Sequence, residues 1–180
     1  MDGDLVGPET PVLEELLDTC ASALPAAESV LRAARQAVAD KVTADGKIIT
    51  QRLDAEQFAA HGYAWLATYV EGVRQMLEWA RRLDADGQLG ELEQLMVQSA
   101  FGEYLNQIEG GIAISQVEIV RPGDLGLTDD DLTPLRNGAA ARLRAEGNTT
   151  AVRARIAALI VDGHFGHLGL RDETLDMIRD

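Results

Sequence analysis

DAEQFAAHGYAWLATYVEGVRQMLEWARRLD, residues 54–84, carries the strongest helical pattern in the chain. Its apolar residues recur at steps of three and four, which places them on one face of a helix. Asp54 with Gln57 three residues later is typical of a helix start, and Arg81 and Arg82 suit the negative end of the helix dipole. The pattern predicts one long helix with a buried stripe, which Leu66, Val70 and Leu77 widen. The stripe comprises Phe58, Gly62, Trp65, Tyr69, Val73, Met76, Ala80 and Leu83.

A second helix is predicted over 89–108, before the glycines Gly110 and Gly111. The turn signal Asp86-Gly87 leaves so short a connection that the helices of 54–84 and 89–108 are expected to pack antiparallel. We expect Trp65 to be buried between them. The predicted fold is therefore all-α, an irregular helical bundle built on these two long helices.

Shorter patterns complete the predicted bundle. Residues 47–50 have an extended pattern, but no partner strand is evident for them. Thr128 and Asn148 are typical helix caps. Further helices are expected at 11–24, at 25–42, from near Ser115 to 120, from Thr128 towards Gly147, and at 149–161.

The domain organisation follows from where these patterns begin and end. Residues 1–10 are acidic and contain glycine and proline, so we expect them to be disordered. Residues 11–162 are predicted to form one helical domain. Residues 163–170 contain three glycines and are predicted to be a hinge loop. Residues 171–180 have the pattern of a helix start, and no helix stop signal follows within the sequence. We therefore expect this segment to be the start of a further domain.

The charge and the cysteine content of the chain limit which partners and which cellular compartment are expected. A net charge of −14 disfavours nucleic acid and anionic membranes as partners, because both repel an acidic surface. The single cysteine, Cys20, excludes an internal disulfide. No apolar run is long enough to span a membrane, and the first residues lack the pattern of a secretion signal. A cytoplasmic location is the expectation.

Polar and aromatic residues on the two long helices form a candidate cluster. If these helices pack antiparallel, the side chains converge and form a hypothetical ligand or interface contact set. The alternative for the histidine is a hydrogen-bonded position at the edge of the core. The set comprises His61, Tyr63, Trp65, Tyr69, Glu103 and Tyr104.

Other candidate chemistry is weak, so no catalytic, cofactor-binding or metal-binding residue is assigned. His164 and His167 lack a complete set of metal ligands, and a glycine-rich loop is the better interpretation. Cys20 has no neighbouring histidine or basic cluster that would activate it, which favours a packed thiol.

Three segments carry a resemblance to a known family. They read HGYAWLATYVE at 61–71, FGEYL at 101–105 with GGI at 110–112, and VRPGDLGL at 120–127. They resemble the N-terminal extension of the methylsuccinyl-CoA dehydrogenases, flavin enzymes of the acyl-CoA dehydrogenase family. Residues 170–180, LRDETLDMIRD, resemble the opening of the first helix of the dehydrogenase domain itself.

The resemblance implies an activity for a longer parent polypeptide rather than for this chain. In that family a glutamate removes the α-proton of a CoA thioester and hydride passes to FAD. The residues that bind FAD and the catalytic glutamate have no counterparts in this sequence, so no cofactor is expected here. The resemblance implies a dehydrogenase domain as partner, in cis or in trans, and a homo-oligomer.

Three functional hypotheses remain open. The first is an accessory helical module of a flavin-dependent acyl-CoA dehydrogenase. The second is a free-standing helical interaction or dimerisation module. The third is an independent enzyme, which is the weakest because no nucleophile–base pair or metal set stands out. The reading frame after Asp180 would separate the first two.

Overall fold

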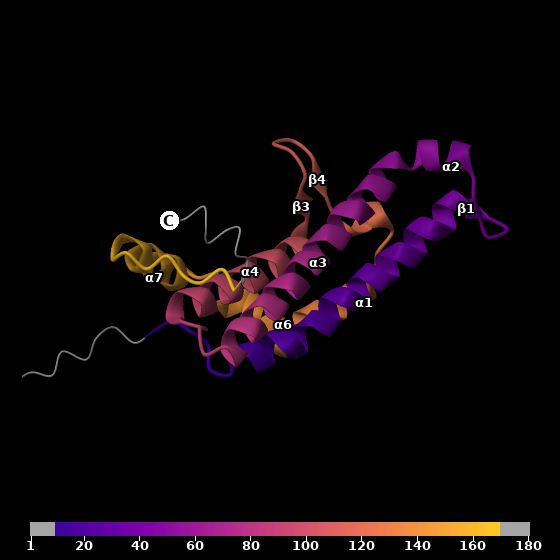
Figure 1. The fold of residues 1–180 in the computed structure, drawn as a ribbon. Coiled ribbons are helices and arrows are strands. Elements are labelled where there is room, and N and C mark those ends of the chain that lie inside the picture. Colours follow the sequence, from indigo (N-terminus) through magenta and orange to yellow (C-terminus); the bar gives the residue numbers. More distant parts are fainter. Residues whose placement is uncertain (1–9, 170–180) are drawn as a thin grey trace, which may run out of the picture.

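The computed structural model describes residues 10–169, which form an irregular, mostly helical bundle. The predicted all-α class is confirmed. The bundle is elongated, with a β-hairpin at one end and the last described helix at the other (Figure 1). Residues 1–9 of the stretch predicted to be disordered (1–10), and the helix predicted at 171–180, lie outside the described residues.

The first helix, α1 (Leu16–Val42), replaces two predicted helices. Pro25 lies inside it, whereas we expected Pro25 to begin a new helix. A proline inside a helix removes one hydrogen bond and costs about 3 kcal/mol. One continuous buried face outweighs that loss, because it runs past the proline at helical spacing. Its members are Leu16, Thr19, Cys20, Ala23, Ala27, Val30, Ala34, Val38 and Val42.

The segment before α1 is irregular, so the predicted start at Pro11 is also wrong. The reason is a buried amide on α4 (Glu91–Gly110). The side chain of Gln98 is fully buried, and its Oε1 accepts a hydrogen bond of 2.7 Å from the backbone N–H of Leu13. Its Nε2 donates to the carbonyl of Pro11 at 3.0 Å. The second bond takes the Pro11 carbonyl, which a helix starting at Pro11 would have used for its own first turn.

A hairpin and a short helix occupy the predicted connector. Strands β1 (Thr43–Ala44) and β2 (Lys47–Ile48) pair antiparallel, so the predicted extended piece does have a partner. Asp45 and Gly46 have φ of 49° and 72°, the left-handed pair that a tight hairpin turn requires. Helix α2 (Thr50–Ala55) follows.

The long helix α3 (Gln57–Ala85) begins three residues later than predicted. Asp54 lies inside α2, and Glu56 caps α3 without a side-chain bond. The predicted capping role of Asp54 is therefore wrong. The residues that were predicted to start the long helix belong instead to the end of the separate helix α2.

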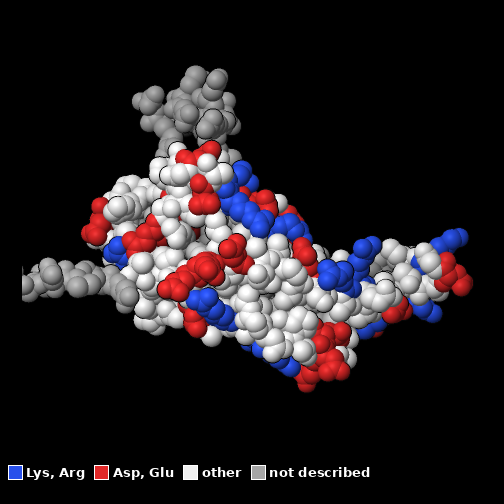
Figure 2. Space-filling view, turned by 90° about the horizontal axis from the view of Figure 1, so that it is seen from below, with Lys and Arg blue, Asp and Glu red and all other residues white. Residues whose placement is uncertain are grey.

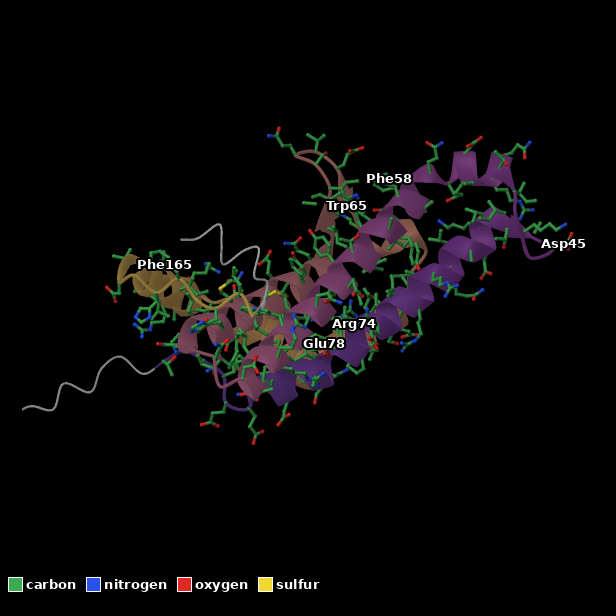
Figure 3. The ribbon with its side chains drawn as sticks, in the orientation of Figure 1. Asp45, Phe58, Trp65, Arg74, Glu78 and Phe165 are labelled. Carbon is green, nitrogen blue, oxygen red and sulfur yellow. The ribbon has the colours of Figure 1, made fainter. Side chains whose placement is uncertain are left out.

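The buried face of α3 is rotated from the predicted stripe. Phe58 is 44% exposed, and Trp65, Tyr69 and Met76 are half-buried at the edge (Figure 3). The predicted burial of Trp65 between the two long helices is wrong. Aromatic residues with a polar tip suit such an edge because the ring is covered while the tip finds a partner. The buried set is Ala59, Gly62, Leu66, Val70, Val73, Leu77, Ala80 and Leu83.

Helix α4 runs back beside α3, as the short connection predicted (Figure 1). Phe101 is its fully buried centre. After Gly111 the chain forms a second hairpin from β3 (Ile112–Ala113) and β4 (Ile119–Val120), which projects from the bundle (Figure 1). The helix predicted from near Ser115 is wrong.

Short helical turns and two helices close the bundle. Thr128 forms a capping box with Asp131, as its place in the sequence predicted for a cap. The next cap is Thr149, one residue after the predicted Asn148. The elements are η1 (Pro122–Leu125), α5 (Asp129–Leu132), η2 (Thr133–Arg136), α6 (Gly138–Glu146) and α7 (Thr150–Val161).

Helix α4 meets the α6–α7 connection at a crossing of two glycines. A methyl group on Gly102 would lie 2.7 Å from the backbone nitrogen of Asn148. A methyl group on Gly147 would lie 2.8 Å from the carbonyl oxygen of Gln98. The close approach of the two backbones therefore depends on both glycines.

The surface carries both signs of charge. On the face shown in Figure 2, acidic side chains are interspersed with basic ones despite the acidic excess of the chain. Within the part of the chain that the structure describes, no helix combines the length and apolarity needed to cross a membrane.

Candidate functional site

The predicted cluster contains an aromatic and polar group between α3 and α4. The rings of Tyr69 and Tyr104 stack with centroids 4.6 Å apart and planes at 28°. The hydroxyl of Tyr69 donates to Oε1 of Gln107 at 2.9 Å. Nε2 of Gln107 then donates to Oε1 of Glu103 at 2.6 Å. The antiparallel packing thus brings Tyr69, Tyr104 and Glu103 together, as predicted.

The polar end of this group is held in defined protonation states. Hydrogen bonds from Gln107 and then Asn148, the latter 2.9 Å from Oε2, hold the pKa of Glu103 below its ordinary value. Burial, followed by the charges of Tyr104 and Glu103, raises the pKa of Tyr69. At neutral pH the glutamate is therefore ionised and Tyr69 neutral. These shifts move both groups away from the range useful for general acid–base catalysis.

Two of the other predicted members, His61 and Trp65, form a separate pair on the outer side of α3. Nε1 of Trp65 donates to Nε2 of His61 at 2.9 Å, and the rings meet edge to face with centroids 6.2 Å apart. This bond requires an unprotonated Nε2 on His61. Tyr63 packs against the edge of the main core. As a ligand contact set, the six residues stay a prediction.

Sequence reasoning missed the attachment of the loop after α7. Glu93 is only 3% exposed, and its Oε1 accepts a 2.6 Å hydrogen bond from the backbone N–H of His167. Nε1 of Trp79 donates to the carbonyl of Leu168 at 3.0 Å. These bonds tie the loop to the end of α3 and the start of α4. A glutamate among the apolar residues of α4 was the available sequence signal.

This attachment borders a cavity and an apolar surface. The cavity measures about 490 Å³ and is lined by 90–93, Leu159 and 163–167. Phe165 lies beside it at the α7 end of the bundle, far from Asp45 at the opposite end (Figure 3). Among residues 10–169, no group of three or more His, Cys, Asp or Glu side chains is placed to hold a metal ion.

The described cavities are poorly matched to a flavin dinucleotide. The cavity beside α7 presents Glu91 and Glu93, and the one beneath the N-terminal segment presents Glu14, Glu15 and Glu91. FAD carries a negatively charged pyrophosphate, which such carboxylates repel. These two cavities therefore do not fit FAD, and no reaction step is assigned to them.

The comparison with known proteins bears on this fold as a whole. No family model matches the chain. The (2S)-methylsuccinyl-CoA dehydrogenase of Cereibacter sphaeroides is 49% identical over 174 residues, which cover 94% of this chain. The predicted resemblance is confirmed. The match spans 31% of that dehydrogenase, so this chain is similar to under a third of a longer acyl-CoA dehydrogenase.

Proposed function

We propose that this chain is an accessory helical module of a flavin-dependent acyl-CoA dehydrogenase. The observation that carries the proposal is a 49% identity that extends along 94% of this chain but only 31% of the dehydrogenase. In the whole protein the reaction would be the α,β-oxidation of a CoA thioester with FAD, in the cytoplasm. The module would shape the substrate site or the oligomer.

The chemistry of residues 10–169 supports an accessory role. Its most conspicuous polar group, around Glu103, consists of side chains that satisfy one another. The thiol of Cys20 is fully buried, and burial raises its pKa to about 12, which suppresses the reactive thiolate. The acidic cavities disfavour both FAD and the phosphates of a CoA thioester.

The test compares two proteins. One is the complete product of the reading frame that encodes this chain, and the other is residues 1–180 alone. We expect the complete product to be yellow and to oxidise (2S)-methylsuccinyl-CoA with an artificial electron acceptor. Residues 1–180 should be colourless and inactive. A reading frame that stops after Asp180, or flavin bound to residues 1–180, would contradict the proposal.

A second candidate is a free-standing interaction or dimerisation module. The supporting observation is a set of exposed apolar residues away from α7: Phe58 is 44% exposed, and Val117 at the tip of the second hairpin is 90% exposed. Sedimentation of residues 1–180 would support it if a stable dimer formed and Val117→Ser with Phe58→Ser dissociated it.

A further inference from the structure

We propose that the apolar surface formed by Ile160, Val161, Phe165 and Leu168 is the face on which this module docks against the dehydrogenase portion of the protein. We call it the C-terminal apolar face. The inference rests on the proposed function and deepens it, because it names the surface through which the module would act.

The exposure of these side chains is the first observation. Val161 and Phe165 are each 85% exposed, Leu168 is 58% exposed and Ile160 is 49% exposed. All four lie within nine consecutive residues. Single exposed apolar residues are ordinary, so it is the concentration of four large ones in so short a stretch that points to an interaction surface.

The packing of α7 explains why this group stays uncovered. Val152 and Leu159 are buried and form a small core with Leu92 and Leu95 of α4. The inner side of α7 is thereby occupied. Ile160 and Val161 follow Leu159 directly and lie on other sides of the helix, which leaves Ile160 half covered and Val161 largely uncovered.

The loop that carries Phe165 and Leu168 is held in place. The Glu93 bond to the backbone N–H of His167 and the Trp79 bond to the carbonyl of Leu168 fix the loop at two adjacent residues, next to its exposed apolar side chains. Gly166 has a φ of 72°, and a methyl group there would lie 3.2 Å from Oε1 of Glu93. A surface fixed before binding loses less conformational entropy when a partner docks.

The dehydrogenase portion is the partner that best accounts for this face. The relative that matches this chain extends well beyond the matched 31%, so a large further portion is available. Gly169, the last described residue, follows Leu168 directly, so this face lies at the end of the described chain. Glu91, which lines the cavity beside Phe165, is already paired with Arg155 at 2.5 Å, so we expect the partner surface to be mainly apolar.

Hydrogen exchange provides the test. Residues 158–169 are compared between residues 1–180 alone and the complete polypeptide, with the hairpin 112–120 as the internal reference. We expect exchange in 158–169 to be roughly tenfold slower in the complete polypeptide, the change that about 1.4 kcal/mol of local stabilisation produces. The reference hairpin should exchange at the same rate in both proteins.

Two variants of the complete polypeptide distinguish docking on this face from an effect of simply having more chain attached after residue 169. Phe165→Ser with Leu168→Ser should abolish the added protection, whereas Val117→Ser on the hairpin should leave it intact. Both variants change exposed side chains, so the unfolding midpoint of residues 1–180 should not move with either.

The outcomes distinguish the two proposals. Protection that appears at 112–120 instead of 158–169 overturns the docking face while leaving the accessory module standing. Protection of 158–169 that survives the Phe165 and Leu168 substitutions also overturns the docking face. A complete polypeptide that lacks flavin and dehydrogenase activity overturns the proposed function itself.

Discussion

Replacing Gly102 by alanine tests the close crossing of α4 with the α6–α7 connection. Alanine is the better helix former by about 1 kcal/mol, so propensity alone predicts a more stable protein. The structure predicts the opposite. The new methyl group would lie 2.7 Å from the nitrogen of Asn148 and 2.9 Å from the Cα of Gly147. Both contacts are with backbone, which cannot rotate away.

The size of the effect follows from these distances. Carbon atoms in contact ordinarily lie about 3.5–4.0 Å apart, so the two segments must separate by most of an ångström. Overpacking of this kind costs about 1–3 kcal/mol, and occasionally more. The upper end of that range applies because both contacts are with backbone, and the gain of about 1 kcal/mol in helix propensity then leaves a net loss of about 2 kcal/mol in the free energy of unfolding.

Gly110 is the matched control on the same helix. A methyl group on Gly110 meets nothing within 4 Å, so Gly110→Ala should be neutral or slightly stabilising. Urea denaturation measures both variants. With a slope of about 2 kcal/mol per M, Gly102→Ala should lower the midpoint by about 1 M. A Gly102→Ala midpoint at or above that of Gly110→Ala would refute the crossing.

Three further expectations concern the core, the polar group and the thiol. Phe101→Ala should cost about 3–5 kcal/mol because the ring is fully buried, and the half-buried Trp65→Ala should cost less in the same denaturation experiment. Glu103→Gln tests the lowered pKa: a lowered carboxyl pKa stabilises the fold above its ordinary value of 4.5. The stability gap between parent and variant should persist down to that pH and close as pH falls further, and a gap that does not change with pH would contradict this. Cys20 should react with a thiol reagent only as fast as the protein unfolds, because its thiol is buried with a pKa raised to about 12.

Long periodic patterns predicted the bundle well, since they sum many weak preferences. The two long helices, their antiparallel packing and the role of Thr128 were all evident in the sequence. The face of α3 was less certain because its apolar residues cover more than one side. Leu66 and Val70 take the centre, while Trp65 turns its polar tip to His61.

Errors concentrated where tertiary contacts decide the local structure. The Pro25 position looked like a helix start because the sequence does not show that α1 is buried along one continuous face. The strands of both hairpins are two residues long, which is too short to produce the alternation of apolar and polar residues that predicts a strand. The stacking of Tyr69 on Tyr104 followed from helix packing. The attachment of the last loop by Glu93 joins residues 74 positions apart, so the sequence could show an unusual glutamate on α4 but not its partner.

The buried amide of Gln98 sets where this domain can be cut. Its two hydrogen bonds go to Pro11 and Leu13, ahead of the first helix at Leu16. An expression clone or fusion that started at the helix would leave a fully buried side chain with one donor and one acceptor unused, a loss of several kcal/mol. The practical boundary for producing the domain therefore lies at or before Thr10, several residues upstream of the first regular element.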